Sequence, residues 1–280
     1  MPLRNPSYLD LETLLAQADY HDIDVPRKEE VVERRGRKRS AGGTAGLTGF
    51  GATASIGSDV EFQRSYTLTP SSKATVSRVI DGLIAADAVK TDPDGQTPLS
   101  KDDLVEVEGT ARITAASLAG KMFHIFHRLM ESSAGGLETI FDFDVDSFEV
   151  AEQLKAVYLR NELLPIPVLL EMTGSRLPQK VYVNLRPDNF VDAASSNRLE
   201  GEMRVLGSVV RLVDGGKEGY LGAEEWLLDG WEYLMRRKLM TQIDDVLKDL
   251  VSQLELDIPA DDVHAYIKGP AVLVDAVALY

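Results

Sequence analysis

The strongest constraint on the fold is the texture of the chain beyond Pro165, where the sequence turns from helical to strand-like. Four segments there are rich in β-branched and aromatic residues and have the length of strands. They read PVLLEM, KVYVNLRPDNFV, EMRVLGSVVRLVD and AYIKGPAVLVDAVALY. Such segments are typical of a sheet. In the third of them, we expect Gly207 to let two strand backbones approach closely.

One long helix is predicted between these strands, over residues 223–256. Its apolar residues recur at intervals of three or four, which places them on one helix face. They are Leu239, Ile243, Val246, Leu250 and Leu254. We therefore expect residues 165–280 to form a mostly antiparallel sheet packed against this helix. The same apolar face would also suit a homo-oligomer formed through residues 223–256.

The first part of the chain, residues 1–164, has the pattern of a winged helix. Residues 8–20 predict a short amphipathic helix, and residues 70–87 carry one apolar stripe at helical spacing. The next stretch, AVKTDPDGQTPLSKDDLVEVEG, predicts a strand, a turn and a second strand. The sequence therefore predicts an α+β fold: a winged-helix-like element and helices up to residue 164, then mostly antiparallel sheet with one long helix.

The segment 27–58 is the least like globular sequence, and we expect it to be a flexible basic loop rich in glycine. Glycine frees the backbone, and small side chains bury little surface. Three interpretations stay open: a mobile connector, a segment that orders on a partner, and a nucleotide-binding loop based on GFGATA, which no strand precedes. The candidate partner- or ligand-binding residues are Arg34, Arg35, Arg37, Lys38, Arg39, Gly49 and Gly51.

Nucleic-acid binding is the alternative function. The formal net charge of −15 repels a phosphate backbone unless a local basic patch overrides it. The basic arm at 34–39 would bind phosphates by counterion release, and the helix 70–87 would read a groove. The candidate recognition residues on that helix are Lys73, Thr75, Ser77 and Arg78. The loop that follows is acidic, which disfavours a wing lying on phosphates.

A metal-dependent enzyme is a weaker alternative. Two histidines stand three apart on a predicted helix, and FDFDVDSF would place three aspartates on one strand face. The candidate metal ligands are His124, His127, Asp142, Asp144 and Asp146. The competing interpretation is an amphipathic helix followed by a half-buried strand with a solvated acidic face. We expect no cofactor.

Several classes of function are excluded or disfavoured by what the sequence lacks. It has no cysteine, which excludes disulfides, thiolate metal sites and a cysteine nucleophile. It has no GxSxG, HExxH or P-loop motif. No stretch approaches the roughly 20 apolar residues that cross a bilayer, and the first residues lack the apolar core of a signal peptide. We therefore expect a cytoplasmic, non-catalytic protein without membrane contact.

Three short motifs resemble an uncharacterised bacterial family that is known only as a domain of unknown function. They are YLD at 8–10 with the leucines that follow, EMRVLGSVVRLV at 202–213, and KGPAVLVDAVALY at 268–280. The resemblance spans nearly the full chain and transfers no active site. It implies a bacterial accessory or sensor protein, in a stress or defence locus. The expected function is thus a non-catalytic binding or regulatory protein that recognises a partner protein or a small ligand.

Overall fold

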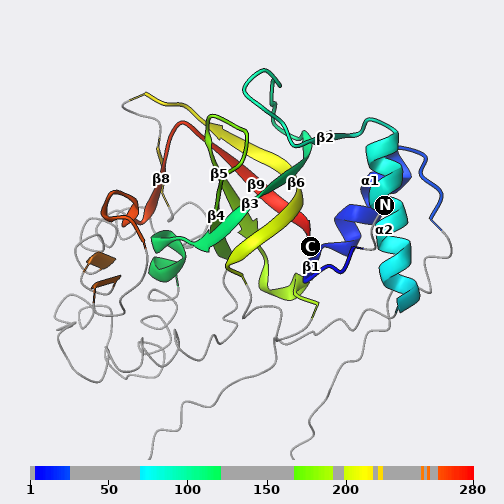
Figure 1. Ribbon diagram of the computed structural model, residues 1–280, viewed down its shortest axis with the longest axis horizontal. Helices are drawn as coiled ribbons and strands as arrows, with labels where there is room; N and C mark the ends of the chain where they lie inside the picture. The colour runs from blue at the N-terminus through cyan, green and yellow to red at the C-terminus, as the bar shows by residue number, and fades with distance from the viewer. Residues whose placement is uncertain are drawn as a thin grey trace, which may run out of the picture.

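The part of the structure that can be described is built around one sheet. The computed structural model describes residues 4–25, 70–120, 167–191, 199–216, 220–222, 247–248, 251–252 and 258–280. Within these ranges seven strands form a single sheet, and two more form a separate ribbon. Figure 1 shows the curved sheet at the centre of the molecule, with two helices on one flank and the ribbon on the other.

Five of these strands close into a barrel. They are β3 (Leu104–Ile113), β4 (Val168–Thr173), β5 (Lys180–Leu185), β6 (Gly201–Val213) and β9 (Ala271–Leu279). Each pairs with the next in the order β3-β4-β5-β9-β6, and β6 pairs back onto β3. The β5–β9 pair is parallel, and the other four pairs are antiparallel. Closure removes the exposed edges of an open sheet.

The connectivity of the barrel is a Greek key. Numbered along the chain, its strands are ordered 1-2-3-5-4 around the barrel, with the third and fifth parallel. This is the strand arrangement of the OB-fold. Two connections are long: residues 114–167 join the first two strands, and residues 214–270 join the last two. Both contribute to the site described below.

The barrel interior is filled by alternate residues of the five strands. Val107, Leu170, Val183, Val209 and Val274 all belong to this buried cluster. The longest strand, β6, bends to close the barrel, and its register with β9 shifts at two points. At Gly207 the two backbones come so close that an added Cβ would lie 2.5 Å from the carbonyl oxygen of Asp275. The close approach predicted at this glycine is therefore confirmed.

Two short strands extend the barrel where its own strands diverge. Strand β9 pairs with β5 along residues 271–275 and then, on the same edge, with β1 (Tyr8–Leu9). In the same way β3 pairs with β2 (Val89–Thr91) at its start and with β4 at its end. These short strands satisfy backbone groups that the barrel strands leave unpaired.

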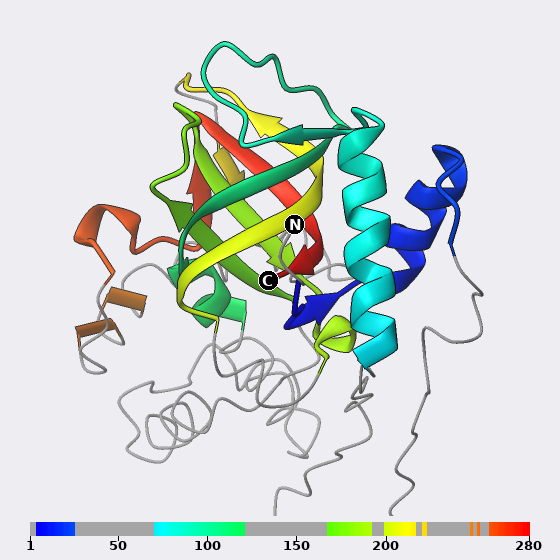
Figure 2. The same cartoon turned by 45° about the vertical axis from the view of Figure 1, so that its right-hand side comes forward.

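Two helices cover one outer flank of the barrel. Helix α1 (Leu11–Tyr20) begins at Asp10, whose side chain accepts a hydrogen bond from the Thr13 amide at 3.1 Å. Helix α2 (Pro70–Ala85) has the apolar stripe that the sequence predicts, and Figure 2 shows it beside the barrel. Leu14, Ile80 and Leu83 pack with residues of β3, β6 and β9 in a second buried cluster.

A buried ionic cluster ties the start of the described chain to α2 and β3. The Arg4 guanidinium contacts the carboxylates of Asp81 and Glu106 and lies over the Tyr280 ring, with its Cζ 5.2 Å from the ring centroid. The Tyr280 hydroxyl donates a hydrogen bond to Glu106. Burial, followed by the contact with Glu106, raises the pKa of Tyr280 above its usual value, so the hydroxyl stays a donor.

The prediction of a β-hairpin after α2 is wrong, and the prediction of a winged helix is wrong with it. Strands β2 and β3 lie parallel, whereas a wing is an antiparallel hairpin. The connecting loop is held by Asp94, whose carboxylate accepts hydrogen bonds from the amides of Gln96 at 2.9 Å and Thr97 at 3.1 Å. The alternating sequence pattern predicts the two strands correctly but carries no information about their direction.

The predicted fold class is therefore also wrong. In the part of the chain that the structure describes, the fold is a closed β-barrel with few helices, not a winged-helix-like part joined to a separate antiparallel sheet. Because β3 pairs with β4 and β6, the barrel takes strands from both sides of residue 164. The predicted helix 223–256 lies outside the described residues, apart from 247–248 and 251–252. None of the helices that can be described is long and apolar enough to span a bilayer.

Candidate functional site

The outer face of β4 and β5 is buried, which is unusual for the outside of a barrel. Leu169, Glu171 and Tyr182 point outward, yet their exposed fractions are only 1%, 5% and 7%. They are covered by residues 115–120 and by a ribbon of β7 (Tyr220–Gly222) and β8 (Tyr266–Lys268). The two long connections of the barrel thus fold back onto the face of its second and third strands.

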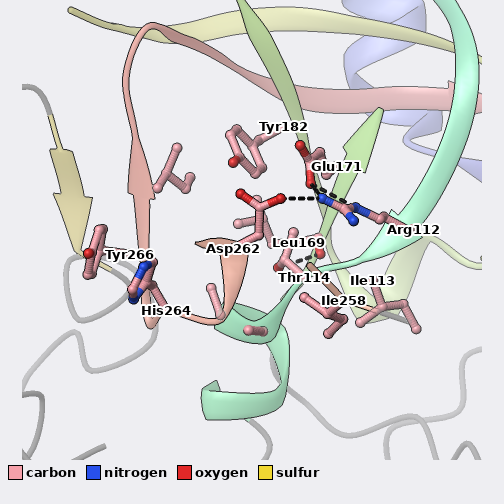
Figure 3. A pocket seen from close by; sticks show the side chains of 13 residues that line it. Arg112, Ile113, Thr114, Leu169, Glu171, Tyr182, Ile258, Asp262, His264 and Tyr266 are labelled. Atoms are coloured by element: carbon pink, nitrogen blue, oxygen red, sulfur yellow. Dashed lines mark hydrogen bonds and ion pairs between the residues drawn. The ribbon is translucent and has the colours of Figure 1, made fainter. Parts of the chain in front are cut away.

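A pocket of about 180 Å³ opens between β5 and the segment 258–270. We call it the β5–β8 pocket. Its described lining residues are Pro178, Lys180, Tyr182, Asp261, Asp262, His264, Tyr266, Lys268, Gly269 and Pro270. A cavity of about 20 Å³ adjoins it and reaches inward to Arg112 and Leu169. Figure 3 shows the shared wall, with Tyr182 and Asp262 on one side and His264 and Tyr266 on the other.

Strand alternation decides which side chains line the pocket. On β8, Tyr266 and Lys268 share one face, while Ile267 between them is buried on the other face against the barrel. On β5, Lys180 and Tyr182 point outward, while Val181 points into the barrel core. The pocket is therefore lined by alternate side chains of β5 and of β8.

An ionic network joins the segment 258–262 to the barrel. Arg112 of β3 donates hydrogen bonds to Glu171 of β4, with its Nε 2.9 Å from Oε2, and to Asp262, with its Nη2 2.6 Å from Oδ2. Asp262 belongs to the 3-10 turn η4 (Ala260–Asp262). Lys180 of β5 donates to the other oxygen of Asp262 and lies 3.4 Å from Glu171. Four side chains from four elements thus hold one wall of the pocket in place.

The network fixes the protonation of its members. Burial alone would raise the pKa of Asp262, but hydrogen bonds from Lys180 and Arg112 outweigh it and lower the pKa below its usual value. Burial alone would lower the pKa values of Arg112 and Lys180, but their contacts with Glu171 and Asp262 outweigh it and raise both pKa values. Burial, and then the nearby carboxylates, raise the pKa of Tyr182. At neutral pH Asp262 is a carboxylate and Tyr182 a neutral hydroxyl.

An aromatic pair also lines the pocket. The rings of His264 and Tyr266 stack with centroids 4.5 Å apart and planes 14° from parallel. Lys268, one step further along the same face of β8, is exposed at the rim. The pocket therefore combines a stacked aromatic pair, a carboxylate acceptor, a phenol donor and a cation. It suits the binding of a small polar molecule better than acid–base chemistry, because its buried charges already have partners.

Two of the residue sets predicted from the sequence cannot be placed. Both the set predicted to bind a partner and the set predicted to bind metal lie outside the described residues. The partner set is Arg34, Arg35, Arg37, Lys38, Arg39, Gly49 and Gly51. The metal set is His124, His127, Asp142, Asp144 and Asp146. Among the residues that are described, no three acidic or histidine side chains gather as metal ligands.

The helix set predicted for nucleic acid lies on α2. Thr75 and Ser77 are buried, and the Ser77 hydroxyl accepts a hydrogen bond from the Arg4 amide at 3.0 Å. Lys73 donates to Asn5, and exposed Arg78 donates to Thr75 at 3.4 Å. These four residues therefore do not form one free face of the helix.

The residues of the β5–β8 pocket are absent from the candidates predicted from the sequence. One signal for them was available: Glu171 is the only charged residue in the otherwise apolar strand PVLLEM, and a buried carboxylate needs a cation. Its partners Arg112 and Lys180 sit on other strands, and Asp262 lies in a loop, so nothing in the local sequence connects them.

Comparison with known proteins gives a family and nothing more specific. No curated protein and no solved structure matches the chain. One family model matches residues 3–280, and its description is a domain of unknown function, DUF6414. The match covers nearly the whole chain, barrel and pocket included. The protein therefore belongs to this family, the domain of unknown function DUF6414.

Proposed function

We propose that this protein is a non-catalytic binding protein that takes a small ligand in the β5–β8 pocket. The observation that carries the proposal is the position of the pocket. It lies on the outer face of the third barrel strand, β5, beside the connection 214–270, and the small cavity that adjoins it reaches the second strand and the start of the connection 114–167. Barrels with this strand order use the same face and the same two connections to bind ligands.

The proposal of binding without catalysis follows from the charges. Glu171 and Asp262 are each held by Arg112 and Lys180, and the pKa of Asp262 is lowered. A carboxylate with a lowered pKa is a poor general base near neutral pH, because catalysis favours a group whose pKa lies near the working pH. The network therefore supports a rigid wall rather than a proton-transfer group.

The proposal of a small ligand follows from the size and shape of the pocket. Drug-sized ligands occupy pockets of roughly 300–1,000 Å³, and a cavity of roughly 150 Å³ holds one benzene ring. The β5–β8 pocket, at about 180 Å³, therefore fits one ring system with small polar groups. The 27–58 loop stays a prediction as a further contact with a partner.

A screen with a blocked pocket tests this proposal. Purified protein is analysed by native mass spectrometry for a co-purified compound and screened by thermal shift against a library of small polar molecules. Pro178→Trp adds bulk to the pocket wall, and Pro98→Trp adds the same bulk to an exposed loop elsewhere. We expect a stabilising compound that Pro178→Trp abolishes and Pro98→Trp does not.

Two results would overturn the proposal. One is a complete screen that gives no ligand of the pocket: either no compound binds, or every compound that binds to the wild-type protein binds equally well to the Pro178→Trp variant. The other is chemical conversion of the bound compound by the wild-type protein, since a binding protein releases its ligand unchanged.

A further inference from the structure

We propose that the ligand of the β5–β8 pocket is an uncharged sugar, one ring of which enters the pocket between β5 and the segment 258–270. This inference rests on the proposed function and names the chemical class of the ligand. Three features of the pocket carry it: a buried hydroxyl that the described residues leave without a hydrogen bond, a set of neighbouring donors and acceptors, and the balance of charge.

The first feature is the hydroxyl of Tyr182, a residue that lines both the pocket and the small cavity beside it. Tyr182 is only 7% exposed, yet its hydroxyl makes no hydrogen bond within the part of the chain that the structure describes. Burial, followed by the nearby carboxylates, raises its pKa, so the hydroxyl keeps its proton at neutral pH. A buried donor without an acceptor costs free energy, which a ligand oxygen that accepts from Tyr182 would remove.

The second feature is an adjacent donor and acceptor on the same wall. Lys180 has three N–H donors, and its contacts with Asp262 and Glu171 leave the third one available. Asp262 accepts one hydrogen bond on each oxygen and keeps a lone pair on both. A sugar hydroxyl both donates and accepts, so neighbouring hydroxyls of one ring can bind Lys180 and Asp262 together. A ligand that only accepts, or only donates, serves one of the two.

The third feature is the balance of lysine and aspartate charges around the pocket. Two lysines and two aspartates are among its described lining residues, and their charges cancel: Lys180, Lys268, Asp261 and Asp262. Behind this wall, buried Glu171 is matched by Arg112. A ligand with a net charge of either sign would bring a charge that none of these residues balances, whereas an uncharged polar ligand brings none.

The size of the pocket and the charge of the chain favour a sugar ring over a nucleic acid. Barrels with this strand order bind oligonucleotides and oligosaccharides on the outer face of the second and third strands. The formal net charge of −15 repels a polyanion but does not repel an uncharged sugar. A cavity of roughly 150 Å³ holds one six-membered carbon ring. The volume of about 180 Å³ therefore leaves room for one sugar ring, and any further ring would lie outside the pocket.

NMR titration of the wild-type protein tests the inference, because it measures weak as well as tight binding. The uncharged probes are glucose, galactose, mannose and maltose. The uronic acids of the three hexoses carry the same ring with a negative charge, and tetrahydropyran is the ring without hydroxyl groups. We expect at least one uncharged sugar to bind, the uronic acids to bind more weakly than the matching hexoses, and tetrahydropyran to give no signal.

Matched variants then assign the contacts. Tyr182→Phe should weaken sugar binding by roughly two- to tenfold, as the loss of one neutral hydrogen bond does. It should not lower the free energy of unfolding, because the hydroxyl has no partner among the described residues; a hydroxyl with a purely structural role would show the opposite pattern. Tyr20→Phe, at a ring that is 82% exposed on α1, should change neither quantity. Pro178→Trp should abolish sugar binding, and Pro98→Trp should leave it unchanged.

The outcomes separate this inference from the proposed function. If no uncharged sugar binds, but another compound does and Pro178→Trp blocks it, the ligand class is wrong and the binding function stands. A uronic acid that binds more tightly than its hexose, or tetrahydropyran that binds as well as a sugar, would also overturn the inference. Equal binding of a sugar to the wild-type and Tyr182→Phe proteins would place that sugar elsewhere and contradict it. If Pro178→Trp blocks no compound in either screen, both proposals fall.

Discussion

Arg112 and Asp262 lie 150 residues apart in the chain, and their side chains form an ion pair with a nitrogen–oxygen distance of 2.6 Å. Arg112 is the next-to-last residue of the first barrel strand, whereas Asp262 belongs to the connection between the last two. Lys180 binds the other oxygen of the same carboxylate. One aspartate therefore fastens the segment that forms a whole wall of the β5–β8 pocket.

Replacing that aspartate should loosen the wall and destabilise the fold. Asp262→Asn removes the charge that Arg112 and Lys180 share, and we expect a loss of about 1–3 kcal/mol in the free energy of unfolding. Asp261→Asn is the matched control, because Asp261 is an exposed neighbour in the same turn. Urea unfolding of both variants measures the difference, and equal stability of the two would contradict this role for Asp262.

The contribution of Asp262 should depend on pH in a defined direction. Its pKa is lowered in the folded protein, because hydrogen bonds from Lys180 and Arg112 outweigh the burial that alone would raise it. A carboxylate with a lowered folded pKa contributes stability that is fully present above its unfolded pKa, roughly 3.9, and is lost as pH falls through the folded value. The stability gap between wild type and Asp262→Asn should therefore be constant from pH 7 to 5 and shrink below about pH 4. A gap that widens in acid would show that the sign is wrong.

The individual elements of the fold could be predicted because their signals are local. The strands β4, β5, β6 and β9 match, to within one residue at an end, segments that composition marks as strands, and α2 lies within the predicted helix 70–87. Alternation of apolar residues records which face of a strand is buried. It does so whether the sheet is open or closed.

Barrel closure and the site could not be predicted, because they depend on pairings between distant strands. The parallel pairing of Val183 with Val274 and the antiparallel pairing of Val107 with Val205 leave no mark in either local sequence. The same holds for the ionic network beside the pocket, whose four members come from four elements. Glu171 alone carried a signal, since a carboxylate in an apolar strand requires a cation somewhere in the fold.

The contact between β6 and β9 should not tolerate a side chain at Gly207. A Cβ there would lie 2.5 Å from both the Asp275 carbonyl oxygen and Cγ1 of Val274, so the strands would have to separate. We expect Gly207→Ala to cost about 1–3 kcal/mol or more, as overpacking does. Gly216→Ala is the control, because nothing lies within 4 Å of its added Cβ. Chemical denaturation measures both, and a neutral Gly207→Ala would argue against the close strand approach.

The ionic cluster at Arg4 should depend on the hydroxyl of Tyr280. That hydroxyl donates to Glu106, a carboxylate that is only 3% exposed. Tyr280→Phe keeps the ring under Arg4 but removes the donor, and we expect a loss of about 1–3 kcal/mol in the free energy of unfolding. Tyr20→Phe, at an exposed ring, should change stability by less than about 0.5 kcal/mol. Similar melting temperatures for the two variants would show that the hydrogen bond to Glu106 contributes little.

Tyr8 should make the protein sensitive to alkali. Its hydroxyl accepts hydrogen bonds from the Arg186 amide at 3.0 Å and from the Asn189 side chain at 3.3 Å. Burial raises its pKa to about 12, whereas the unfolded value is about 10. A group whose folded pKa is raised contributes stability that is present below its unfolded pKa and lost as pH rises through the folded one.

Tyr8→Phe should therefore be less stable than wild type at pH 7, because the Arg186 amide loses its acceptor. It should also lose less stability between pH 9 and 11, by on the order of 1 kcal/mol, because it has no hydroxyl to ionise. Tyr20→Phe should follow the wild-type pH profile, since its ring is exposed in the folded chain. Urea unfolding at the two alkaline pH values measures the slopes. Parallel slopes for wild type and Tyr8→Phe would mean that ionisation of Tyr8 does not oppose folding.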